Sequence, residues 1–248
     1  MFRFSFMAAA AALLATQVSA QTSSECDPTK GDICPDNPAL GTTFDYTFND
    51  TLAEMDDRFF NVSAGAQLIS YDKDGAAFAI RKHGDSVLVK TGFYIFYGRV
   101  EAIMSAAPGQ GVISSVNMLS DDLDEIDWEL LGGKNDVAST NWYGKGNRDQ
   151  QNGMDPALEN AVGEFHNYTI IWTEQELQFW LDDKNVRTVT AGTGEPGTYP
   201  QTPCHINLSL WAGGDPNNEP GVIAWAGGET DYDAGWVTLL DDFNWIKR

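Results

Sequence analysis

The segment DEIDWELLGG carries three carboxylates at alternating positions, Glu125, Asp127 and Glu129, with the apolar residues Ile126 and Trp128 between them. Two local structures are open for this pattern. On a helix, Glu125 and Glu129 would share a face while Asp127 pointed away. On a strand, all three carboxylates lie on one face and the apolar residues on the other. We favour the strand, because it separates the polar from the apolar side chains completely.

Crowded carboxylates repel one another, so at least one pKa should rise, and a folded protein seldom keeps them without a use. A pair of carboxylates is the minimal equipment for cleaving a glycosidic bond, with one acting as nucleophile and the other as general acid. A retaining mechanism needs the two carboxyl groups about 5–5.5 Å apart. The Cα atoms of Glu125 and Glu129 would lie roughly 13 Å apart on a flat strand. The strand must therefore bend or twist, with Asp127 orienting one glutamate and tuning its pKa.

The acidic line has two other conceivable uses. A solvated acidic edge would need no chemistry, and a calcium site would need oxygen ligands wrapped around an ion. A straight strand does not surround an ion as an EF-hand loop does. We therefore expect no metal at this line and no cofactor.

The elements that must position these residues are short β-rich runs, many of which alternate apolar and polar residues. No long amphipathic helical pattern stands out in the mature region, and turn residues separate the runs. Their number and spacing predict an all-β, two-sheet antiparallel sandwich. The runs cover residues 66–71, 76–81, 86–91, 94–104, 111–119, 167–173, 177–183, 186–191 and 205–212. Two Gly- and Asn-rich loops, 143–156 and 211–232, are expected to carry binding residues.

The sequence DEIDWELLG resembles the E-x-D-x-E signature of glycoside hydrolase family 16, in the form without a β-bulge. The segments FYGRVEAIMSAAPGQGVISSVNML and FHNYTIIWTEQELQFWLDD resemble the surrounding strands of that family. The segments TNWYGKG, YPQTP and WAGGDPNNEPGVIAWAGGETDY are similar to the fungal Crh-type chitin–glucan transglycosylases, as is the Cys pair near the mature N-terminus. The resemblance covers most of residues 26–240. Two departures are Cys204, where an apolar residue such as Met is expected, and the missing Ser/Thr-rich stalk and lipid-anchor signal.

The resemblance implies a concanavalin-like β-jelly-roll sandwich with sugars lying across a concave sheet. It also implies that Glu125 is the nucleophile, Glu129 the general acid and then the general base, and Asp127 the orienting partner. Further candidates for sugar contacts come from the flanking segments, because aromatic side chains and a few polar groups line such sites. These candidates are Asn141, Tyr143, Lys145, Arg148, Gln151, Trp211, Trp225 and Arg99. A core position for the tryptophans and a solvated loop for Lys145, Arg148 and Gln151 remain open.

The N-terminus has the pattern of a signal peptide over residues 1–20, with Arg3, an apolar stretch and small residues before Gln21. Residues 21–248 would then form a single catalytic domain with an N-terminal extension. In an oxidising compartment Cys26 and Cys34 would pair within CDPTKGDIC, leaving Cys204 as a buried free thiol. Four sequons make Asn49, Asn61, Asn167 and Asn207 candidate glycosylation sites.

These patterns together predict a secreted, extracellular or cell-wall enzyme. We expect it to cleave chitin with retention and to transfer the product to β-glucan or chitin. The alternatives are an endo-acting β-glucan or chitin hydrolase of the same superfamily and a lectin-like binding module. A net charge of −21 argues against nucleic acid and anionic membranes as partners. The final segment DDFNWIKR is not apolar, so we expect no membrane span in this chain, and we expect a monomer.

Overall fold

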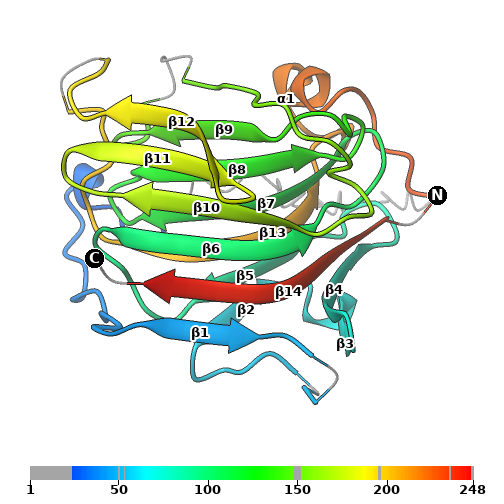
Figure 1. Ribbon diagram of the computed structural model, residues 1–248, viewed down its shortest axis with the longest axis horizontal. Helices are drawn as coiled ribbons and strands as arrows, with labels where there is room; N and C mark the ends of the chain where they lie inside the picture. Colours follow the sequence, from blue (N-terminus) through cyan, green and yellow to red (C-terminus); the bar gives the residue numbers. More distant parts are fainter. Residues whose placement is uncertain are drawn as a thin grey trace, which may run out of the picture.

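The computed structural model describes residues 24–49, 51–52, 54–147, 152–194, 197–234 and 236–246. Two antiparallel sheets lie one over the other, as Figure 1 shows. This arrangement confirms the predicted two-sheet sandwich. In spatial order, the six-stranded sheet consists of β2 (Phe60–Ala64), β5 (Val87–Thr91), β13 (Cys204–Ala212), β7 (Val112–Ser120), β8 (Glu125–Leu131) and β9 (Ser139–Tyr143).

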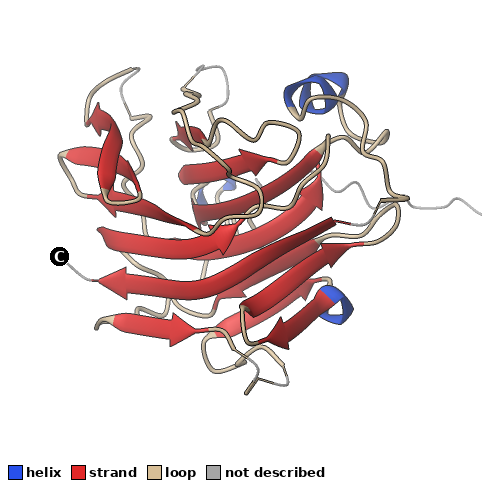
Figure 2. Ribbon diagram, turned by 45° about the vertical axis from the view of Figure 1, so that its right-hand side comes forward, coloured by secondary structure: helices blue, strands red, loops and turns tan. Residues whose placement is uncertain are grey.

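The second sheet has eight strands. Its order is β12 (Lys184–Thr190), β11 (Glu176–Leu181), β10 (His166–Trp172), β6 (Gly98–Ser105), β14 (Trp236–Ile246), β4 (Gly75–Ile80) and β3 (Ile69–Asp72), and β1 (Phe44–Thr47) also pairs with β14. Strands dominate, as Figure 2 makes plain. Short helices are the 3₁₀ turns η1 (Pro28–Lys30) and η2 (Ala66–Leu68) and the α-helix α1 (Pro220–Trp225). In the described part of the chain, no helix is long and apolar enough to cross a membrane.

The core lies between the two sheets, and strand β8 contributes one row of apolar side chains to it. Ile126, Trp128 and Leu130 are all fully buried and belong to the main apolar core. The indole Nε1 of Trp128 donates to the backbone oxygen of Thr169 on β10 at 3.2 Å, which joins the two layers. Burying one apolar row contributes on the order of 2 kcal/mol per large side chain. A slip of one residue would put the acidic row into the core instead, so the register of β8 is strongly specified.

Two predicted runs and one predicted loop differ in detail from the observed elements. The run 66–71 opens with η2, and strand β3 begins only at Ile69. The run 94–104 is not one strand, because Tyr97 and Gly98 have φ angles of 64° and 132° and β6 begins at Gly98. A positive φ breaks an extended strand and favours glycine. The loop expected over 211–232 contains a short helix, α1.

The N-terminal extension is attached to the body of the sandwich. The predicted disulfide between Cys26 and Cys34 is present, with Cα atoms 5.6 Å apart. Further along, the backbone N–H of Tyr94 donates to the oxygen of Pro38 at 2.7 Å. Cys204 is a buried free thiol, as expected. The predicted signal peptide lies outside the described residues.

Candidate active site

Strand β8 presents the three carboxylates on the face of the six-stranded sheet that points away from the core; we call this the acid face. The antiparallel register aligns its side chains into rows across the strands. One row runs from Asn141 on β9 through Asp127, Asn117 on β7 and Asn207 on β13 to Lys90 on β5. The neighbouring rows pass through Glu125 and Glu129 and carry Tyr143 and Ser139 respectively on β9. The strand predicted for the acidic segment, with all three carboxylates on one face, is confirmed.

Glu125 and Asp127 are buried at 6% and 3% exposure, whereas Glu129 is partly exposed. The side-chain amide of Asn117 donates to Oε1 of Glu125 at 3.4 Å. Burial, followed by the charges of Glu125 and Glu129, raises the pKa of Asp127 well above its usual range. A hydrogen bond between Asp127 and Glu125 acts in the same direction. A protonated Asp127 can donate that hydrogen bond, which leaves Glu125 as the ionised partner.

The strand next to β8 supplies two of the predicted sugar contacts. Asn141 and Tyr143 lie opposite Asp127 and Glu125, and both side chains are partly exposed on the acid face. Nδ2 of Asn141 donates to the hydroxyl of Tyr143 at 2.7 Å. Burial, and then the nearby carboxylates of Asp127 and Glu125, raise the pKa of Tyr143, so the phenol keeps its proton. The structure therefore brings both residues beside the carboxylates.

Lys145, predicted to contact sugar, forms an ion pair at the end of the acidic strand. Its Nζ lies 2.8 Å from Oδ2 of Asp124, a fully buried carboxylate at the start of β8. The backbone N–H groups of Lys145 and Gln201 and the hydroxyl of Thr202 also donate to Asp124. Asp124 therefore fastens two loops to the end of the acidic strand. This pairing gives the ammonium a structural contact, and the predicted sugar contact stays a prediction.

Arg99 was expected to reach the groove, and this prediction is wrong. Arg99 lies on β6, in the eight-stranded sheet, where it pairs with Glu101. The alternate residues Val100 and Ala102 are buried in the core, so the side chains of Arg99 and Glu101 point to the outer face of the opposite sheet. The sandwich core separates that face from the carboxylates.

The two tryptophans predicted to contact sugar lie together under and within helix α1. Trp211 is on the acid face by its register with Ile113, yet it is only 4% exposed and packs against Leu131 and Ala226. Trp225, at the end of α1, stacks on it with ring centroids 6.2 Å apart and remains partly exposed. Trp211 therefore supports the stacked ring of Trp225, and its predicted contact with sugar stays a prediction. Arg148 and Gln151 lie outside the described residues.

Sequence reasoning missed several polar residues of the acid face. Asn117, His205 and Asn207 are each at least nine-tenths buried there, and Asp124 supports the end of the strand. A signal was present in the run 205–212, where polar His205 and Asn207 alternate with apolar residues that point into the core. The structure also shows that the sequon at Asn207 is 1% exposed, whereas Asn61 is exposed on an edge strand.

This arrangement holds two glutamates on one strand face, one more buried than the other, with a carboxyl of raised pKa between them. Such a pair of unequal environments is how one site provides both a nucleophile and a proton donor. The sandwich and its site therefore define a carbohydrate-processing enzyme of the glycosidase class.

Comparison with known proteins agrees with this assignment. The family described as glycosyl hydrolases family 16 matches residues 56–227, and the chain belongs to this family. Crh-like protein 2 of Botryotinia fuckeliana (strain B05.10) is 44% identical over 228 residues, covering 90% of this chain and 49% of that protein. Crh-like protein 4 of Aspergillus fumigatus (strain ATCC MYA-4609 / CBS 101355 / FGSC A1100 / Af293) is 43% identical over 242 residues, covering 96% of this chain and 52% of that protein. The chain thus spans about half the length of these relatives.

A solved structure of a Crh5 transglycosylase in complex with NAG is also similar. It superposes with a TM-score of 0.84 and 37% identity, and the match covers 90% of this chain and 91% of that one. The jelly-roll sandwich predicted for the chain is therefore the fold of its structural relatives.

Proposed function

We propose that the protein is an exported cell-wall transglycosylase that cleaves chitin with retention and transfers the product to β-glucan or chitin. The observation that carries the proposal is the placement of Glu125, Asp127 and Glu129 side by side on the acid face of a family 16 sandwich. Similarity to Crh-like proteins and to a Crh5 transglycosylase supports transfer over simple hydrolysis. The NAG in that related structure supports an N-acetylglucosamine polymer as substrate.

In the first step, the Glu125 carboxylate attacks the anomeric carbon and forms an ester bond to the sugar. The bond between that carbon and the leaving oxygen breaks, and Glu129 gives its proton to this oxygen. In the second step, Glu129 takes a proton from an incoming hydroxyl, whose oxygen displaces the Glu125 carboxylate. Two inversions at one carbon give net retention.

Two neighbouring side chains hold Glu125, the nucleophile of the first step, in place. Asn117 donates to Glu125 and Asp127 shares a hydrogen bond with it, so these two contacts hold the Glu125 rotamer. Glu129 is partly exposed, so an acceptor can reach it. Burial of Glu125 keeps water from one side of the intermediate, and binding of an acceptor sugar then competes with water for the other.

A single mixing experiment tests the proposal. The protein is incubated with chitin oligomers and fluorescently labelled laminarin oligomers, and the products are identified by mass spectrometry. We expect labelled hybrid products whose mass includes both N-acetylhexosamine and hexose units. Shorter chitin oligomers with no labelled hybrid would identify a hydrolase instead. Binding without new products would identify a lectin-like module.

A further inference from the structure

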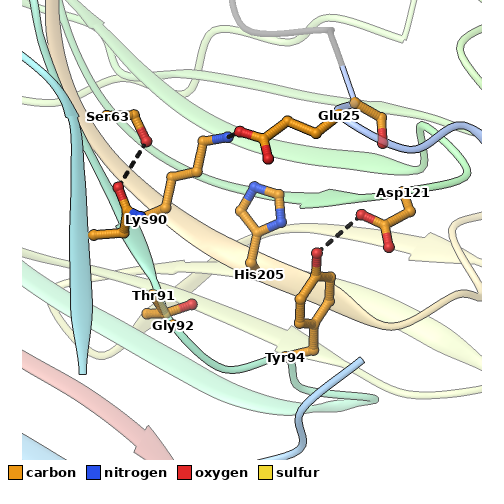
Figure 3. A pocket seen from close by; sticks show the side chains of 10 residues that line it. Glu25, Ser63, Lys90, Thr91, Gly92, Tyr94, Asp121 and His205 are labelled. Carbon is orange, nitrogen blue, oxygen red and sulfur yellow. Dashed lines mark hydrogen bonds and ion pairs between the residues drawn. The ribbon is translucent and has the colours of Figure 1, made fainter. Parts of the chain in front are cut away.

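A polar pocket lies on the acid face, at the side of the six-stranded sheet away from β9. Its volume is about 200 Å³, and β2, β5, β13 and the N-terminal extension contribute to its walls. Figure 3 shows the ring of His205 between Lys90 and Glu25 on one side and Tyr94 and Asp121 on the other. The pocket is separate from the three carboxylates, since none of them lines it.

His205 is the feature of this pocket that calls for a ligand. The residue is 8% exposed, and its Nε2 atom is buried with no hydrogen-bond partner among the residues that the structure describes. Burial, and then the charge of Lys90, lowers the pKa of His205 to about 4, so the ring is neutral at mildly acidic pH. A neutral imidazole offers one donor and one acceptor. A buried polar atom without a partner costs free energy that a hydroxyl or amide of a ligand would recover.

The charges around His205 favour a neutral ligand. Nζ of Lys90 lies 3.9 Å from Oε1 of Glu25, so the extension offsets its charge. Both carboxylate oxygens of Asp121 already accept hydrogen bonds, from the Tyr94 hydroxyl at 2.9 Å and the Asn37 amide at 2.8 Å. Two carboxylates face one ammonium group, which disfavours an anion. A polyhydroxylated sugar unit suits such a mixture of donors and acceptors.

The register places His205 in the same row of side chains as Glu125. His205 is aligned with Leu119 on β7, which is aligned with Glu125 on β8, so two strand spacings separate His205 from Glu125. At about 4.8 Å per spacing this separation is roughly 10 Å. Lys90 lies one strand further. A glycan lying across the strands from Glu125 would therefore bring a unit other than the reacting one to His205.

We propose that this pocket is a distal sugar subsite in which His205 hydrogen-bonds a unit of the bound glycan, so that long donors are preferred over short ones. The inference rests on the proposed function, because the ligand is taken to be the same polysaccharide. Its consequence is specific to length: a donor too short to reach the pocket gains nothing from His205.

The test compares short and long chitin oligomers as donors for the wild type and for His205→Ala and His205→Phe. The second variant keeps a ring against Tyr94 and removes both nitrogen atoms. His166→Phe is the matched control, because His166 lies on β10 and pairs with Asp182. All proteins carry Asn61→Gln, because Asn61 lines the pocket and an attached glycan would add a second sugar there. We expect kcat/KM for long donors to fall roughly tenfold in both His205 variants while short donors and the control are unchanged.

Equal losses for short and long donors, or no loss in a folded variant, would overturn the inference and leave the proposed function intact. Calorimetry in a Glu125→Gln background separates the two claims. There we expect long oligomers to bind more tightly than short ones, and His205→Phe to abolish the difference. If no oligomer is turned over yet this length-dependent binding is found, the proposed function fails and the subsite stands. Absence of any length dependence in binding contradicts the subsite.

Discussion

The amide of Asn117 reaches the carboxylate of Glu125 at 3.4 Å, although the register of β7 and β8 aligns Asn117 with Asp127. The contact therefore runs diagonally across the two strands, since Glu125 itself is aligned with Leu119. Strand β7 therefore holds a carboxylate of the neighbouring strand in place. Asn117 is 2% exposed and also hydrogen-bonds Asp127, so it acts by positioning these two carboxylates.

Replacing Asn117 by Ala should lower kcat with little change in KM. The physical reason is a loss of orientation at Glu125, for which a misplacement of about 1 Å can cost on the order of 10²-fold. Steady-state kinetics with a saturating acceptor measure the effect. Asn185→Ala, at an exposed position on β12, is the matched control. A rise in KM at constant kcat would show that Asn117 contributes to substrate binding instead.

Asp127→Asn should lower turnover and, with rising pH, increase stability relative to the wild type. The pKa of Asp127 is raised in the folded state, so the folded protein binds the proton more tightly than the unfolded chain does. Its contribution to stability is complete below the unfolded pKa, about 3.9, and is lost as pH rises through the folded pKa. From pH 4 upward, the Tm of Asp127→Asn should therefore rise relative to the Tm of the wild type as pH increases. Turnover should fall at the same time, and a constant difference in Tm across pH would contradict this account.

Lys145→Met should destabilise the protein while leaving sugar affinity nearly unchanged. The ammonium group is the charged partner of buried Asp124, and loss of one partner of such a pair costs about 1–3 kcal/mol when other donors remain. Chemical denaturation of the single variants and of the double variant with Asp124→Asn measures the coupling. A large loss of affinity for chitin oligomers with unchanged stability would restore Lys145 as a sugar contact.

Glycan occupancy should differ among the four sequons. Asn207 lies in the middle of β13 with 1% exposure, so a glycan there is incompatible with the folded sheet. Glycopeptide mass spectrometry of the secreted protein should find Asn207 unmodified, with any modification confined to Asn49, Asn61 and Asn167. A substantial occupied fraction at Asn207 in folded protein would mean that β13 is placed differently.

Much of the site follows from the alternation in one short segment. Because side chains of a strand point to opposite faces in turn, Glu125, Asp127 and Glu129 had to share a face once their segment formed a strand. The same rule correctly predicted Asn141 and Tyr143 as neighbours. The rule tells which residues share a face but not to which sheet a strand belongs. Arg99 shows this limit, because its alternation is equally clear on the outer face of the other sheet.

Burial by a distant segment is the second limit. Trp211 has the parity of the acid face, but α1 covers it, and only the packing of residues far along the chain decides this. The partner of Lys145 was also hidden, since Asp124 precedes it by 21 positions and was read as part of the acidic run. Tyr97 adopts a positive φ, and its residue type gives no signal of this in the sequence.

The central claim is that Glu125 forms the covalent bond to the sugar while Glu129 supplies and removes the proton. Intact-protein and peptide mass spectrometry of Glu129→Gln, given a donor with a good leaving group that needs no acid, tests it directly. We expect a glycosyl-enzyme to accumulate, because the base for the second step is missing, and the added mass to lie on the peptide that contains residue 125. The matched variant Glu125→Gln should remain folded and show no added mass. Added mass on that variant, or on a peptide elsewhere in the chain, would contradict the account.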